Sequence, residues 1–94
     1  MKMNKTITIS NHEFIVSNNH YQYIEISHQN KKIKIGCEHY QGKKSKPSGI
    51  DIDLSSAFYG DDLSLIEDEE LLETLKEVIK KYYSDHPNWE LNFK

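Results

Sequence analysis

The sequence predicts an α+β fold in which a single antiparallel sheet of five to six strands carries one amphipathic helix packed on one face. Two observations predict it. Short segments of alternating apolar and polar residues fill much of the first 54 positions, and one segment near the C-terminus repeats apolar residues with a helical period. A chain of 94 residues has material for one modest core, so we expect a single domain spanning residues 1–94.

The first four strands are expected to form an N-terminal meander. Their apolar side chains alternate with polar ones, as in strands that bury one face. We expect these strands at residues 6–10, 13–17, 21–27 and 31–38. The connections between them are short and rich in Asn and His, so neighbouring strands must run antiparallel.

Two more strands are expected further along the chain. In residues 50–54 the apolar positions alternate with Asp51 and Asp53, which would point away from the core. Residues 89–93 alternate again, with Trp89, Leu91 and Phe93 on one face. This C-terminal strand would complete the antiparallel sheet.

The helix is the clearest single element of the sequence. Its apolar stripe, at a spacing of three to four residues, consists of Leu71, Leu72, Leu75, Val78, Ile79 and Tyr82. Two starts are open: a capping box at residues 64–67, or Asp68 as N-cap. The stripe begins at Leu71, which favours Asp68, and Pro87 cannot continue the helix.

Charge is distributed unevenly along the chain. Residues 1–50 carry eight Lys against three Glu, whereas residues 51–94 carry four Lys against twelve acidic residues. Such asymmetry favours an electrostatic partner, although the two halves would also neutralise each other in the folded chain. One cysteine and no apolar run of about 20 residues predict a cytoplasmic protein without a membrane span.

No set of residues predicts catalysis or a cofactor. Cys37 continues an apolar strand face, which favours a buried structural thiol over a nucleophile paired with His39. The five His show no zinc spacing, so we expect no metal site. A nucleophile, base and orienting group cannot be assembled, and we therefore expect a protein that is not an enzyme and has no cofactor.

The most unusual feature is a cluster of carboxylates around the helix start. It consists of Asp61, Asp62, Glu67, Asp68, Glu69, Glu70, Glu73 and Glu77. Acidic residues favour a helix N-terminus, but these exceed what capping requires, and like charges on adjacent turns repel. Together with Phe58 and Tyr59, expected on the preceding loop, they would form a surface for a basic partner.

The chain resembles the small immunity proteins of bacterial contact-dependent inhibition and related polymorphic toxin systems. The resemblance lies in the strand meander, the aromatic-bearing segment at residues 50–59 and the acid-capped helix near the C-terminus. It implies a cytosolic, non-catalytic protein that binds one cognate toxin domain, often a basic nuclease, and occludes its active site.

Three other interpretations remain open. A phage-type anti-defence inhibitor would use the carboxylates to mimic nucleic-acid charge. A nucleic-acid-binding module would use Lys31–Lys46, although the absence of Arg and the acidic second half weigh against it. An exposed edge strand would also allow two copies to pair as a homodimer.

Overall fold

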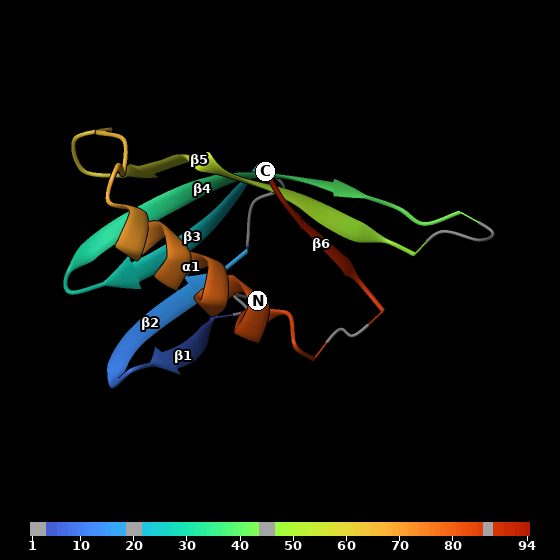
Figure 1. Ribbon diagram of the computed structural model, residues 1–94, viewed down its shortest axis with the longest axis horizontal. Coiled ribbons are helices and arrows are strands. Elements are labelled where there is room, and N and C mark those ends of the chain that lie inside the picture. The colour runs from blue at the N-terminus through green and yellow to red at the C-terminus, as the bar shows by residue number, and fades with distance from the viewer. Residues whose placement is uncertain (1–3, 19–21, 44–46, 86–87) are drawn as a thin grey trace.

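A computed structural model describes residues 4–18, 22–43, 47–85 and 88–94 of the chain. Six strands form one curled sheet in the order of the sequence, and one helix lies across one of its faces (Figure 1). The elements are β1 (Lys5–Ile9), β2 (His12–Ser17), β3 (Tyr23–His28), β4 (Lys31–Tyr40), β5 (Gly49–Tyr59), α1 (Glu69–Tyr82) and β6 (Glu90–Phe93). The predicted α+β class, with one sheet and one helix, is confirmed.

The first four strands form the predicted antiparallel meander. Two of its connections are tight two-residue turns with left-handed backbone. Ser10 and Asn11 have φ values of 50° and 68°, and Gln29 and Asn30 have 51° and 63°. Positive φ at both central residues is the geometry of type I′ turns, whose twist matches that of paired strands.

β5 is much longer than predicted and contains a bulge. Lys34 pairs with Phe58 and Gly36 pairs with Asp53, so three more residues lie between the paired positions on β5 than on β4. An odd number of extra residues exchanges the two faces of a strand. Ala57 is therefore fully buried, whereas uninterrupted alternation from Asp53 would have exposed it.

β6 runs parallel to β5, so the prediction of an antiparallel sheet throughout is wrong for this last pair. The reason lies in the connection. A helix that crosses the sheet returns the chain to the end where β5 began, and the following strand must then run in the same direction as β5. The sheet is therefore mixed.

The helix begins and packs as predicted. The Asp68 side chain accepts hydrogen bonds from the backbone N–H groups of Glu70 and Leu71, which makes it the N-cap. Leu75, Val78 and Ile79 are fully buried against the sheet. Their sheet partners in the same cluster are Ile7, Phe14, Val16, Ile24, Ile26, Ile33, Ile35, Ile50, Ile52 and Ala57. Tyr83, one residue beyond the predicted stripe, is also buried.

The other sheet face carries no helix among the described residues (Figure 1). It presents mostly polar side chains, and Asp51 and Asp53 lie on it as predicted, because their neighbours Ile50 and Ile52 are buried on the helix side. Within the described residues, no helix is both long and apolar enough to cross a membrane. His86 and Pro87, at the predicted end of the helix, lie outside the described residues.

Candidate interaction surface

The predicted carboxylates lie on the loop that leaves β5, on the segment that follows it and on the solvent side of α1. All eight of them are exposed. Figure 1 shows this loop projecting from one end of the sheet, next to the first turn of α1. Sequence and structure therefore agree that negative charge gathers at this end of the helix.

Backbone hydrogen bonds hold the projecting loop in one conformation. The Tyr59 N–H donates to the Ser64 carbonyl, and the Leu63 N–H donates to the Tyr59 carbonyl, each at 2.9 Å. The Ile66 N–H donates to the Ala57 carbonyl, also at 2.9 Å, and the Ile66 side chain is buried. The chain thus folds back along the end of β5 before it enters the helix.

This conformation exposes two leucines. Leu63 and Leu65 leave 70% and 60% of their surface exposed. Leu63 also has a φ of 63°, a left-handed conformation that a non-glycine residue adopts at a cost of about 1 kcal/mol or more. Backbone strain of this kind persists only where the surroundings enforce it, and it is common at binding sites. We name Asp61, Asp62, Leu63, Leu65 and Glu67 the tip.

The sequence contained a signal for these leucines that the helical pattern obscured. Leu63 and Leu65 precede the stripe that begins at Leu71 and alternate with Ser64 between acidic residues. They therefore belong neither to the helix face nor to a predicted strand. Apolar residues without a place in either pattern were the available indication of an exposed site.

Phe58 and Tyr59 are not on an exposed loop, so that expectation is wrong. Both belong to β5, are half-buried and, as strand neighbours, point to opposite faces of the sheet. The Phe58 ring packs edge-on against Tyr23, with centroids 6.1 Å apart. Tyr59 packs against the core, and Lys31 Nζ lies 5.0 Å from the centre of its ring.

Three of the eight carboxylates have partners within the described residues. Asp68 caps the helix, and Glu77 Oε1 lies 3.7 Å from Lys80 Nζ. Asp62 accepts hydrogen bonds from the Ser64 hydroxyl at 2.6 Å and from the Ser64 N–H at 3.0 Å. These bonds hold the pKa of Asp62 below its ordinary value, and the bond from the hydroxyl has the largest effect.

The other five carboxylates form no hydrogen bond or ion pair with any residue that the structure describes. They are Asp61, Glu67, Glu69, Glu70 and Glu73. Glu69 and Glu70 lie in the first turn of α1, where the helix dipole favours negative charge. The negative charge of Asp61, Glu67 and Glu73, outside this turn, is available to a partner.

Neither a protein-family model, nor a curated protein, nor a solved structure matches this chain. The geometry of the described residues and the resemblance to immunity proteins are therefore the grounds for a function.

Hollows lie both beside this surface and away from it. One of about 190 Å³ lies beside the start of α1 and is lined in part by Lys31, Tyr59 and Asp68. A larger one of about 440 Å³ lies on the open sheet face, with Asp51 and Asp53 in its lining. Both carboxylates already have partners: Asp51 lies 3.6 Å from Lys94 Nζ, and Asp53 accepts a hydrogen bond from the Ser55 hydroxyl.

The residues considered for catalysis and metal binding are placed as follows. Cys37 packs against the core but is half-buried, so the predicted burial is only partial. This burial raises the pKa of its thiol to about 11, which keeps it protonated and weakly reactive near neutral pH. His39 hydrogen-bonds through Nε2 to the Asn18 amide at 3.1 Å. No group of three or more His, Cys, Asp or Glu gathers as a metal site among the described residues, which leave out His20 and His86.

The basic stretch Lys31–Lys46 does not form one patch in the described part of the chain. Lys31 begins β4, whereas Lys43 follows the other end of this ten-residue strand, about 30 Å away at 3.3 Å per residue. Lys34, between them, lies 3.8 Å from Glu25 Oε1. Lys44 and Lys46 lie outside the described residues.

Proposed function

We propose that this chain is a non-catalytic, cytoplasmic immunity-type protein that binds and neutralises a cognate toxin domain with a basic, nuclease-like surface. The contact surface is the tip together with the exposed carboxylates of α1. The resemblance to immunity proteins of bacterial toxin systems supplies the class of partner, and the geometry of the tip supports the place of contact.

The exposed pair Leu63 and Leu65 carries the proposal. Apolar side chains that project from a rigid loop bury area on binding without a large cost in conformational entropy. Contacts of this kind, fully desolvated and surrounded by polar groups, account for most of the free energy at protein interfaces. Here Asp61, Asp62 and Glu67 supply the polar surroundings.

The five carboxylates without a partner among the described residues would contribute to recognition and to the association rate. A surface with one sign of charge attracts an oppositely charged partner over about 8 Å at physiological salt. It also disfavours acidic partners. Binding should therefore accelerate at low salt, and the leucines should determine how slowly the complex dissociates.

Co-expression in bacteria tests this function. The chain is expressed with the C-terminal domain encoded by the adjacent gene, and both growth and co-purification are measured. We expect the wild-type chain to restore growth, and the Leu63→Asp/Leu65→Asp variant to lose both rescue and co-purification. Ile15→Asp is the matched control, because Ile15 is 47% exposed but lies on the open sheet face.

Persistent toxicity without co-purification of the wild-type chain would sink the proposal. Equal rescue by the wild-type chain and the tip variant would show that the contact surface lies elsewhere on the molecule.

A second candidate, a phage-type inhibitor that mimics nucleic-acid charge, is favoured by the five carboxylates that have no partner in the described part of the chain. It would bind a nucleic-acid-handling protein through charge alone. Replacing Glu69, Glu70 and Glu73 by Gln would then abolish binding, whereas the leucine substitutions would change it little. No observation on the described lysines favours the nucleic-acid-binding module.

A further inference from the structure

β1 forms one edge of the sheet, and no described strand pairs with its outer side. The two-residue turn at 10–11 closes on the pair Ile9–His12, which is a hydrogen-bonded pair in this type of hairpin. Alternation along antiparallel strands then directs the backbone groups of Thr6 and Thr8 outward, away from β2. Such an edge is a template for another strand.

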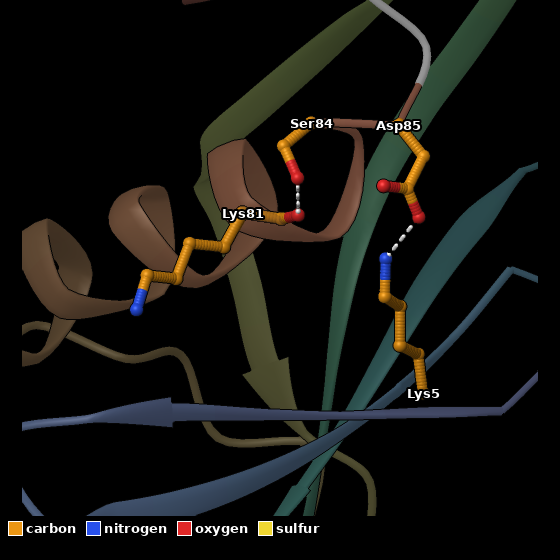
Figure 2. A network of polar contacts seen from close by, with 4 residues as sticks. All are labelled: Lys5, Lys81, Ser84 and Asp85. Atoms are coloured by element: carbon orange, nitrogen blue, oxygen red, sulfur yellow. Dashed lines mark hydrogen bonds and ion pairs between the residues drawn. The ribbon is translucent and has the colours of Figure 1, made fainter.

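The C-terminal end of α1 covers this edge. Lys81 Nζ donates a hydrogen bond to the outward-directed Thr8 carbonyl at 3.2 Å. Asp85 Oδ2 lies 2.5 Å from Lys5 Nζ, so a second contact fastens the turn that follows α1 to β1 (Figure 2). The Ser84 hydroxyl donates to the Lys81 carbonyl at 2.7 Å and holds the turn between the two contacts, as Figure 2 shows.

The opposite edge of the sheet has a different protection. β6 is only four residues long, and a short edge strand offers few backbone groups for pairing. β1 is five residues long, and its outward-directed residues are Thr6 and Thr8. The Lys81 and Asp85 contacts lie at this edge.

We propose that Lys81 and Asp85 form a latch that closes the β1 edge, and that a second copy of this chain pairs with β1 when the latch is opened. The pairing is antiparallel and symmetric about Ile7, so that Thr6 of each copy lies opposite Thr8 of the other. These facing residues are uncharged and β-branched, which suits cross-strand pairing and brings no like charges together. A copy of the same chain is therefore a fitting occupant of the edge.

The first test opens the latch. Lys81→Met/Asp85→Asn removes the hydrogen bond to Thr8 and the ion pair with Lys5 while keeping side-chain size, and light scattering on the eluted full-length chain measures its mass. We expect the wild type at 11.1 kDa and the variant at twice that mass as concentration rises. Glu77→Gln/Lys80→Met, which removes a matched ion pair on the same helix, should stay at the mass of one chain. A latch-open variant that folds and remains monomeric overturns the proposal.

The second test fixes the register. In the latch-open background, Thr6→Lys/Thr8→Lys and Thr6→Glu/Thr8→Glu should each be monomeric, because four like charges would face each other. Mixing the two variants should restore the dimer, since every facing pair then has opposite charges. If the mixture stays monomeric while the latch-open chain dimerises, the copies pair through another surface and β1 is the wrong interface.

If the latch-open chain does not fold, hydrogen exchange on the wild-type chain still tests whether the β1 edge is directed outward. In the wild type, the Thr6 and Thr8 amides should exchange fast while those of Ile7 and Ile9 are protected. Protection of Thr6 and Thr8 in the monomer would contradict an outward-directed edge.

Discussion

Single residues decide which side chains reach solvent at the tip. Sequence reasoning selected Phe58 and Tyr59 as anchors because aromatic residues dominate interfaces. β5 instead extends through both residues, so as strand neighbours they point to opposite faces of the sheet and are half-buried. Leu63 and Leu65 take the exposed positions, because the chain turns back on β5 and leaves them without core contacts. The carboxylate cluster was predictable from sequence, whereas its apolar centre was indicated only by two leucines that fit neither the helical nor the strand pattern.

Cys37 is a residue whose chemistry follows from its burial. Its folded-state pKa of about 11 lies above the ordinary value of 9.0. Near neutral pH the native chain should thus hold about 100-fold less thiolate than the unfolded chain. We expect an aromatic disulfide reagent to modify the native thiol correspondingly more slowly, with the difference lost in denaturant.

The same shift has a defined sign for stability. A raised folded-state pKa favours the folded state below pH 9, and this contribution is lost as pH rises toward about 11. For the modification experiment, an equal rate in native and denatured protein would show that the fold does not shield the Cys37 thiol.

At the scale of elements, the helix was the most predictable part and β5 the least. The stripe from Leu71 to Tyr82 has one period throughout, and Asp68 stands where a cap is needed, so both helix and N-cap could be predicted. A bulge interrupts periodicity, and the Ser-Ser-Ala segment at 55–57 has the composition of a loop. A tertiary contact with β4 holds this segment in the sheet.

That contact is the hydrogen bond from the Gly36 N–H to the Ser56 hydroxyl, at 2.9 Å. A Cβ atom on Gly36 would lie 2.7 Å from the Ser56 Oγ, so Ser56 would have to rotate and lose this bond. We expect Gly36→Ala to lower the free energy of unfolding by about 1–3 kcal/mol, measured by urea denaturation. The control Gly60→Ala, where the nearest such atom is 3.5 Å away, should cost less. Equal effects at the two glycines would mean that the bulge tolerates a side chain.

At the scale of the whole molecule, the alternating and helical patterns of apolar residues predict the class of fold. They do not predict the direction of β6. Alternation in residues 89–93 indicates a strand but carries no information on direction. Direction follows from where the helix returns the chain, which depends on tertiary packing. The extended β4 separates the two ends of the basic stretch, whereas the carboxylates, which are close in sequence, stay together on the tip and α1.

The most direct measurement of the central claim is the affinity of the Leu63→Gly variant for the toxin domain encoded by the adjacent gene. Glycine accepts the left-handed backbone at position 63, so the fold should keep its stability to within about 1 kcal/mol while the contact is lost. By titration calorimetry we expect affinity to fall by about 30-fold or more, as at an interface hot spot, and Ile15→Thr to leave it unchanged. A Leu63→Gly chain that binds the domain as tightly as the wild type would contradict the claim that the tip is the binding surface.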